Sequence, residues 1–122
     1  FIDNVDIEWC YRAASVGYGC YGAVSARMLH SLGDRLMAVP FTRRRLLIHS
    51  PLRIYFITRN RLLLYRMPHV PRNWKLADLP RMLLKIVAFG LLVAPRRRYL
   101  SAALAGIIDG LRGLGGAARK PF

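Results

Sequence analysis

Acidic side chains are scarce in this 122-residue sequence, which carries six Asp and Glu against 20 Lys and Arg. The formal net charge of +14 favours anionic partners and creates a field that keeps carboxylates ionised. Four of the six acids nevertheless fall within the first 34 positions. This concentration of a rare residue type makes the start of the chain the most informative segment. The four acids are Asp3, Asp6, Glu8 and Asp34.

Cysteine is almost absent, since Cys10 and Cys20 are the only two. Their spacing matches no zinc-ligand pattern, which excludes a structural zinc site built on cysteine. The sequence shows no secretory signal segment, so we expect a reduced, cytosolic setting. Both cysteines are predicted to be ordinary small apolar residues.

Long hydrophobic runs and phosphate-binding loops are also missing. The run over residues 82–94 has Lys85 as its only charge, and it is thirteen residues long. A helix that spans a bilayer needs about 20 residues, so this run is too short. The chain has no glycine-rich phosphate loop of its own, and we expect it to bind a nucleotide poorly by itself.

The residues that are plentiful are apolar residues and arginine. Hydrophobic residues make up 54% of the sequence, which argues against disorder. The basic residues are 17 Arg and three Lys. Arginine suits bidentate phosphate recognition better than lysine, so this bias fits a phosphate-bearing partner. Composition alone leaves nucleic acid and anionic lipid equally open, and a GC-rich genome would produce the same bias.

The first element that the pattern predicts is a helix over residues 3–16. Asp3 would cap this helix, with Asp6 three positions later as an approximate capping box. Glu8 and Arg12 form an i,i+4 pair of opposite charge. The apolar face recurs at three- and four-residue spacing and consists of Val5, Trp9, Ala13 and Val16.

Residues 18–30 predict one or two short strands. Residues 31–49 predict a loop around the short apolar piece at 36–39, and a basic run occupies residues 43–45. The first part of the chain, residues 1–49, is therefore predicted to be an α/β remnant.

The second part, residues 50–122, is predicted to be mainly helical. Pro51 suits the first turn of a helix with Ser50 as its cap, and this helix would run to about residue 66. The remaining predictions are a linker at 67–75, helices at 79–94 and 99–114, and a frayed tail at 115–122.

Three segments together resemble family 2 glycosyltransferases, and in particular the rhamnosyltransferase branch. In the first segment, Asp6 is followed two positions later by Glu8 and four further on by Arg12, within the pattern Phe-Ile-Asp-x-Val-Asp-x-Glu-Trp-Cys-x-Arg. The others are His-Ser-Leu-Gly-Asp at 30–34 and Tyr-Phe-Ile-Thr-Arg-Asn at 55–60. The resemblance covers nearly the whole chain and is weakest in its last quarter.

The resemblance implies an α/β, GT-A (Rossmann-like) glycosyltransferase. Residues 1–49 would then be the C-terminal part of the catalytic domain. Residues 50–122 would be a helical C-terminal region that is membrane-associated or oligomerising. Since the sequence begins at Phe1, inside the acidic motif, we expect a C-terminal piece of a larger enzyme that is inactive by itself.

In that family the Asp of the acidic motif is the general base that deprotonates the acceptor hydroxyl, and by resemblance this is Asp6. The step requires an ionised carboxylate within hydrogen-bond reach of the hydroxyl. A helix N-terminus close to arginines would keep Asp6 ionised. The alternative is that Asp3 and Asp6 only cap the helix. Asp3 could also share the acidic role, because Val5 stands where many relatives carry an acid.

Supporting roles follow from the same resemblance. Glu8 and Arg12 are expected to orient the helix, and the second acid of the motif could also contact the acceptor. Trp9 would either stack on a sugar or lie in the core. His30 would help to hold Mg²⁺ or Mn²⁺ on the donor diphosphate, with a metal-binding Asp-x-Asp upstream of Phe1. The alternative for His30 is a purely structural role.

Two basic surfaces complete the prediction. Arg53, Arg59 and Asn60 are predicted to lie together on the helix that begins near residue 51, where they would grip a diphosphate or a lipid-linked acceptor. The alternative is a solvated basic face. The last two predicted helices are apolar with arginines at their ends, which resembles helices lying on an anionic leaflet. The alternative is packing against an upstream part of the protein or a second subunit.

The sequence thus predicts an inverting glycosyltransferase that transfers a deoxysugar, by resemblance rhamnose from dTDP-rhamnose, to a hydroxyl of a surface polysaccharide or lipid-linked glycan. Expected partners are the nucleotide-sugar, the glycan acceptor, a second copy of the chain and the cytoplasmic face of the cell membrane, but no specific nucleic acid. The alternative is a non-enzymatic basic module that binds nucleic acid or anionic membrane. Against nucleic acid, the arginine runs lack the interleaved aromatics of RNA-binding modules.

Overall fold

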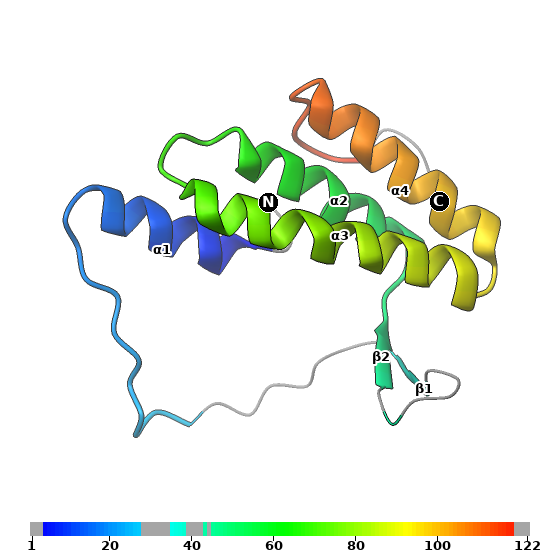
Figure 1. Cartoon of the computed structure of the whole chain (residues 1–122), viewed down its shortest axis with the longest axis horizontal. Helices are drawn as coiled ribbons and strands as arrows, with labels where there is room; N and C mark the ends of the chain where they lie inside the picture. Colours follow the sequence, from blue (N-terminus) through cyan, green and yellow to red (C-terminus); the bar gives the residue numbers. More distant parts are fainter. Residues whose placement is uncertain (1–3, 28–34, 39–42, 44, 119–122) are drawn as a thin grey trace.

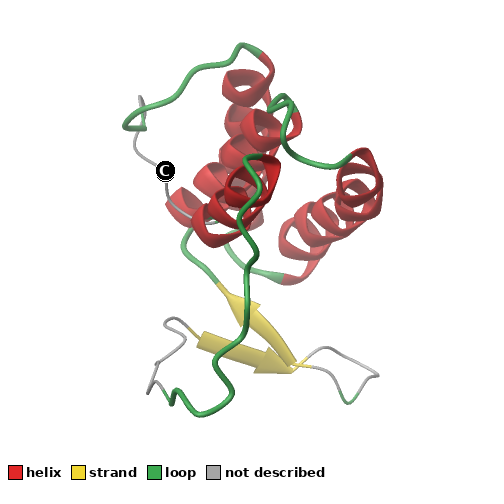
Figure 2. Ribbon diagram, turned by 90° about the vertical axis from the view of Figure 1, so that its left-hand side faces the viewer, coloured by secondary structure: helices red, strands yellow, loops and turns green. Residues whose placement is uncertain are grey.

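The computed structural model describes residues 4–27, 35–38, 43 and 45–118. This part of the chain is mainly helical and contains a two-stranded antiparallel hairpin that projects from one end of the helices (Figure 1, Figure 2). The elements in chain order are α1 (Val5–Ser15), β1 (Arg35–Ala38), β2 (Arg45–Ile48), α2 (Pro51–Tyr65), α3 (Arg72–Leu92) and α4 (Arg96–Leu111).

Helix α2 begins where the sequence predicts. Pro51 occupies its first turn, where a missing N–H costs no helical hydrogen bond. The Ser50 hydroxyl accepts a hydrogen bond from the backbone N–H of Arg53 at 3.3 Å. The helix ends at Tyr65, one residue short of the predicted boundary. Both the cap and the extent of this helix are therefore confirmed.

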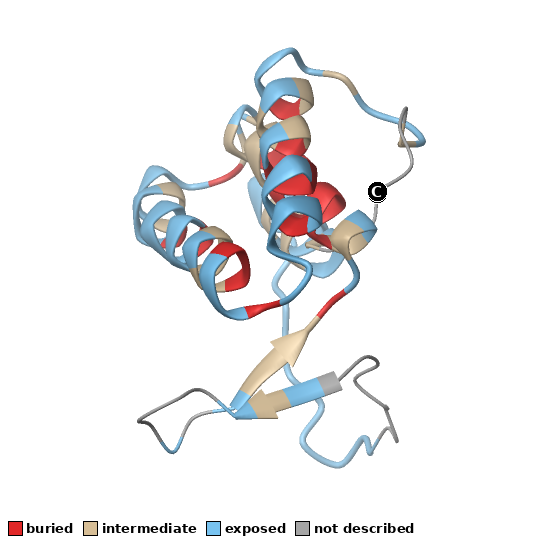
Figure 3. Ribbon diagram, turned by 90° about the vertical axis from the view of Figure 1, so that its right-hand side faces the viewer, coloured by how far each residue is buried: buried red, intermediate tan, exposed pale blue. Residues whose placement is uncertain are grey.

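Helix α2 is also the most buried element of the structure. Eight of its 15 residues are buried, including the unbroken run 54–60. Helices α3 and α4 and the hairpin all contribute to this burial. Figure 3 shows buried positions on the sides of the helices that face one another and exposed positions on their outer sides. The main core cluster comprises Ile54, Ile57, Phe89, Val93, Tyr99 and Ala103, with Met37, Leu46 and Ile48 of the hairpin packed against it.

Helix α4 approaches α2 so closely that glycine is required at the contact. A Cβ atom on Gly106 would lie 2.6 Å from the Tyr55 carbonyl oxygen, well inside van der Waals contact. A Cβ atom on Gly110 would lie 2.7 Å from Leu62 Cβ and 3.0 Å from the Arg59 carbonyl oxygen. Small residues at these two positions, four apart on one side of α4, set the separation of the two helices.

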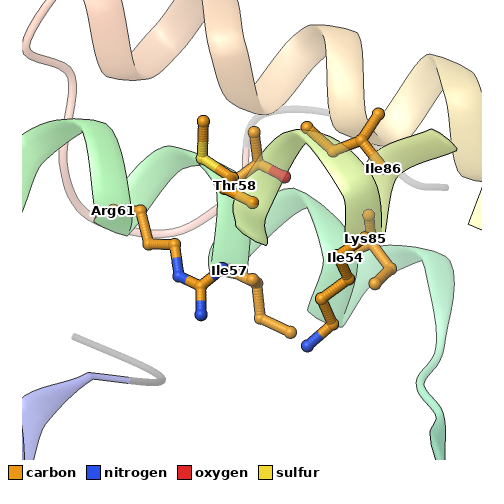
Figure 4. Close-up of a pocket in the computed structure, with 7 residues that line it drawn as sticks. Ile54, Ile57, Thr58, Arg61, Lys85 and Ile86 are labelled. Carbon is orange, nitrogen blue, oxygen red and sulfur yellow. The ribbon is translucent and has the colours of Figure 1, made fainter. Parts of the chain in front are cut away.

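The contact between α2 and α3 is an apolar seam with charged residues along one side. Ile54 and Ile57 of α2 meet Ile86 of α3, and Figure 4 shows Arg61 and Lys85 directed to the same side of this seam.

A polar cluster joins α2 and α3 beside this seam. The Tyr65 hydroxyl donates a hydrogen bond to Asp78 Oδ2 at 2.7 Å, and Arg61 Nε lies 3.4 Å from the same oxygen. Burial, followed by the hydrogen bond to Asp78, raises the pKa of Tyr65 well above its usual range.

The predicted secondary structure of the first 49 residues is largely wrong beyond the first helix. The structure has no strand at residues 18–27, and residues 28–30 lie outside the described part. Tyr21 and Val24 there are 94% and 100% exposed, so no neighbour is available to pair with an extended backbone. The strands form instead inside the predicted loop, where Leu36 pairs with Leu47 in an antiparallel register.

This arrangement corrects the expected α/β remnant in its details. Within the described ranges there is one two-stranded antiparallel sheet and no parallel sheet. A mainly helical structure is compatible with a C-terminal part of a glycosyltransferase, while the GT-A remnant and the domain boundary at residue 49 stay predictions.

The boundaries of α3, α4 and the tail also differ from the prediction. Helix α3 begins at Arg72, within the predicted linker, and contains Pro80. The side chains of Leu76 and Pro80 are exposed, so water can reach the carbonyl that the Pro80 nitrogen cannot bond. Helix α4 begins three residues before the predicted start and ends three before the predicted end. The predicted frayed tail is wrong for residues 115–118, because the Gly116 carbonyl and Ala118 contact α2 and its cluster.

We expect Gly106→Ala to destabilise the chain, because its methyl group would meet backbone atoms of α2 that cannot move independently. Overpacking typically costs about 1–3 kcal/mol, against a helix-propensity gain of about 1 kcal/mol at most. Urea denaturation of the 122-residue chain should therefore show a lower free energy of unfolding. Gly22→Ala is the matched control, because its added Cβ would have no atom within 4 Å. Equal stability of the two variants would contradict the close packing of α4 on α2.

Candidate functional site

Asp6 lies in the first turn of α1, at the helix end where the backbone dipole stabilises negative charge. Its side chain is exposed and lines an open hollow of about 330 Å³ together with Ile7, Cys10, Tyr11 and Trp74. A carboxylate at the edge of an open hollow can be reached by a hydroxyl group of a bound molecule. A general base requires an ionised carboxylate within hydrogen-bond reach of the hydroxyl, and the assignment of Asp6 to that role stays a prediction.

The N-terminal end of α1 does not support the alternative that Asp3 and Asp6 only cap this helix. The N-cap residue of α1 is Asn4, in a left-handed conformation with φ 61°, and not Asp3. Among the described residues, no side chain makes an N-cap hydrogen bond to α1. Asp3 lies outside the described residues, so its sharing of the acidic role stays a prediction.

Glu8 anchors α1 to the rest of the structure. Its Oε1 atom lies 3.0 Å from Arg12 Nε, which confirms the predicted i,i+4 pair. The same oxygen lies 3.0 Å from His69 Nε2 in the connection between α2 and α3. Glu8 thus links α1 to the connection between α2 and α3, through a partner, His69, that sequence spacing did not reveal, while an orienting role for Arg12 stays a prediction.

Trp9 is not in the core, because its side chain is 57% exposed. Within α1, all of whose residues are described, none is buried. The predicted apolar face fails because α1 turns Ile7 and Tyr11 towards the start of α3 and leaves Val5 and Trp9 outward. Stacking of Trp9 on a sugar stays a prediction.

Trp74 forms an aromatic wall beside Asp6 that the sequence interpretation missed. Its ring centroid lies 5.9 Å from that of Tyr11 and 6.1 Å from that of Tyr65, both in edge-to-face geometry. Binding sites often combine such apolar surfaces with a few polar groups that fix orientation. The one sequence signal for Trp74 is that a tryptophan is unusual inside residues 67–75, which the sequence predicts to be a proline-containing linker.

Cys10 lies in the middle of α1 and Cys20 follows the helix, and both are free and exposed rather than packed as small apolar residues. The Cys20 thiol donates a weak hydrogen bond to the Cys10 carbonyl oxygen at 3.8 Å. Desolvation raises the pKa of the Cys10 thiol, and the neighbouring Cys20 thiol and Asp6 carboxylate raise it further. A protonated thiol is a weak nucleophile, so these surroundings do not activate Cys10.

The predicted metal ligand His30 lies outside the described residues, as does Asp34. In the ranges that the structure describes, no group of three or more His, Cys, Asp or Glu side chains could hold a metal ion. These residues therefore do not by themselves fit Mg²⁺ or Mn²⁺.

The sequence predicts that Arg53, Arg59 and Asn60 form one basic face of α2 that binds a phosphate. The structure places these side chains differently. Arg59 and Asn60 are 3% and 0% exposed, so the alternative of a solvated basic face is wrong for both. Arg53 is half-buried in the first turn of α2. The three side chains are therefore not displayed together on an open surface.

The Arg59 guanidinium is committed to contacts inside the protein. Nη1 donates to the Gly116 carbonyl at 2.8 Å and to the Tyr55 hydroxyl at 3.3 Å, and Nε donates to Asn60 Oδ1 at 3.1 Å. The guanidinium also lies 4.8 Å from the centroid of the Phe56 ring, within cation–π range. We assign Arg59 a structural role, and diphosphate binding by this set stays a prediction.

Comparison with known proteins gives one informative relative. The chain is 32% identical over 122 residues to the dTDP-rhamnosyl transferase RfbF of Shigella flexneri, with 98% of the chain covered. The chain spans 40% of the length of that relative. This similarity supports the resemblance to rhamnosyltransferases and a glycosyltransferase-like function. Neither a family model nor a solved structure matches the chain.

Arg59→Lys should destabilise the 122-residue chain, because one ammonium nitrogen cannot reproduce the bonds that Nη1 donates to Gly116 and Tyr55 together with the bond that Nε donates to Asn60. Hydrogen bonds to charged groups contribute about 1.5–3 kcal/mol, and we expect a loss of that order. Chemical denaturation measures it, with the exposed Arg112→Lys as the matched control. A wild-type midpoint for Arg59→Lys would show that the buried network is dispensable.

Proposed function

We propose that this chain is part of a glycosyltransferase that transfers a deoxysugar, specifically rhamnose from dTDP-rhamnose, to a hydroxyl of a surface polysaccharide or lipid-linked glycan. The observation that carries the proposal is the exposed Asp6 at the open hollow, within a chain that is similar over 98% of its length to a dTDP-rhamnosyl transferase. A cytoplasmic, peripheral membrane location and self-association are further proposals that follow from the family resemblance.

In the proposed reaction, the Asp6 carboxylate takes the proton of the acceptor hydroxyl. The acceptor oxygen forms a bond to the anomeric carbon while the bond from that carbon to the donor diphosphate breaks. The diphosphate leaves with the electron pair, and the proton remains on Asp6 until solvent removes it. A single displacement of this kind inverts the anomeric configuration.

The remaining residues around the hollow would orient the acceptor. The rings of Tyr11 and Trp74 offer an apolar surface to the C–H face of a sugar, while Asp6 lies at the edge where hydroxyl groups would point. Glu8 would act indirectly, by holding α1 against His69. The divalent cation is a separate proposal that rests on the family resemblance and on residues outside the described part, including His30.

Asp6→Asn in the full-length protein should abolish transfer, because an amide cannot accept the hydroxyl proton. General bases contribute about 10²–10⁴-fold to the rate, and we expect kcat to fall by that range. The assay is transfer of labelled rhamnose from dTDP-rhamnose to glycan, together with calorimetric binding of the donor, which should be nearly unchanged. Ala14→Ser, at an exposed position of the same helix, is the control. Wild-type turnover by Asp6→Asn would refute the assignment.

Trp74→Leu in the full-length protein should raise KM for the acceptor more than it lowers kcat. An aromatic contact contributes about 0.5–1.5 kcal/mol, which corresponds to a 2- to 12-fold change. Steady-state kinetics with varied acceptor concentration measures the effect. Tyr18→Leu is the control, since it removes an exposed aromatic ring that does not line the hollow. An unchanged KM would exclude the aromatic wall from acceptor binding.

A further inference from the structure

Helix α3 presents an apolar face to the outside of the molecule, on the side opposite to its packing contacts. Leu83, Leu84 and Val87 on this face are 50%, 71% and 52% exposed. A helix that is apolar on both sides has a partner for each side, and the described residues supply a partner for only one. We call the exposed set the α3 outer face, and it consists of Leu76, Leu79, Leu83, Leu84, Val87 and Leu91.

The charged side chains of α3 that are not buried are all cationic. Asp78, the only acid of α3, is 5% exposed and faces inward, where it accepts a hydrogen bond from Tyr65. Arg72 opens the helix and Arg81 stands exposed beside the face. Three exposed arginines, 96–98, follow directly after the helix and begin α4. The apolar face is therefore bordered by cations at both ends and along one edge.

An open groove continues the α3 outer face towards the hairpin. It has a volume of about 710 Å³, and Leu84, Val87 and Leu91 form part of its wall. Arg45 of β2 and Arg81 of α3 also line it. A groove with an apolar wall and cations beside it can take the acyl chain of a phospholipid, while the phosphate of the same lipid lies near the arginines.

We infer that the α3 outer face docks on an anionic lipid leaflet, with α3 lying in the plane of the interface. An apolar surface bordered by cations matches lipid chains beneath anionic head groups. No described helix combines the length and apolar content that a bilayer crossing requires. This lipid contact is independent of sugar transfer.

Other occupants fit the same surface less well. A second copy of the chain would bring its own +14 charge and bordering arginines against the same cations, which is electrostatically unfavourable. Nucleic acid would satisfy the arginines, but it would leave the leucines of the face without an apolar partner. Of these three occupants, only lipid satisfies the charge and the apolar residues together. An upstream part of the protein packed on this face would prevent vesicle binding by the full-length protein.

The test is co-sedimentation of the full-length protein, and of the 122-residue chain beside it, with vesicles of phosphatidylcholine and phosphatidylglycerol in equal amounts. Wild type should bind these vesicles more tightly than vesicles of phosphatidylcholine alone. Leu83→Asp/Val87→Asp should weaken binding about 30-fold, because each charge near the surface contributes about 1 kcal/mol and about 1.4 kcal/mol corresponds to tenfold. Circular dichroism should show unchanged helix content, since both positions are exposed.

The matched control is Val16→Asp/Val24→Asp, which changes the net charge equally at exposed valines far from α3 in the sequence. A second readout is fluorescence quenching by brominated lipid, which should be strong for Leu84→Trp and weak for Val24→Trp.

Three results would overturn the inference. The first is no binding of wild type to anionic vesicles, and the second is equal loss of binding in the two aspartate pairs. The third is a dimer, seen by sedimentation equilibrium, that Leu83→Asp/Val87→Asp separates without changing vesicle binding.

Discussion

The contact of α2 with α4 is the constraint on which the rest of this structure depends. Gly106 and Gly110 let the backbones approach so closely that no side chain fits between them. The Tyr55 hydroxyl then reaches Asp109 Oδ2 at 2.8 Å, and the chain beyond α4 returns to place the Gly116 carbonyl on Arg59. A buried cation is tolerated only when its donors are satisfied in this way. Helix α2 is thereby enclosed, and its polar residues are used for folding.

This enclosure decides which surfaces remain for function. Arg59 and Asn60 are buried and bonded inside the protein, so they are not exposed for contact with a ligand. The exposed polar residues lie at the periphery of the helices. Helix α1 touches the helical body through Glu8 with His69 and through Tyr11 with Trp74, and these contacts leave Asp6 at the rim of a hollow. The Asp6 carboxylate and the Trp74 ring are 68 residues apart in the sequence and line the same hollow.

The proposed lipid surface and the proposed sugar site share helix α3 but use different parts of it. Trp74, in the first turn, faces the hollow with Asp6, while the outer face extends along the rest of the helix. A helix lying on a membrane with the transfer site at its beginning would hold the site close to the leaflet. A lipid-linked acceptor could then reach the carboxylate without leaving the bilayer.

The sequence by itself determined the elements whose signals are local. Ser50 and Pro51 predicted the start of α2, and the Glu8–Arg12 pair needed only four-residue spacing. The tertiary structure alone decided what depends on distant partners. Segment 45–48 became a strand because 35–38 pairs with it, Trp9 stayed exposed because α1 packs through another side, and Arg59 was buried because residue 116 supplies an acceptor. Local spacing states which side chains share a face, but only the packed chain determines what covers that face.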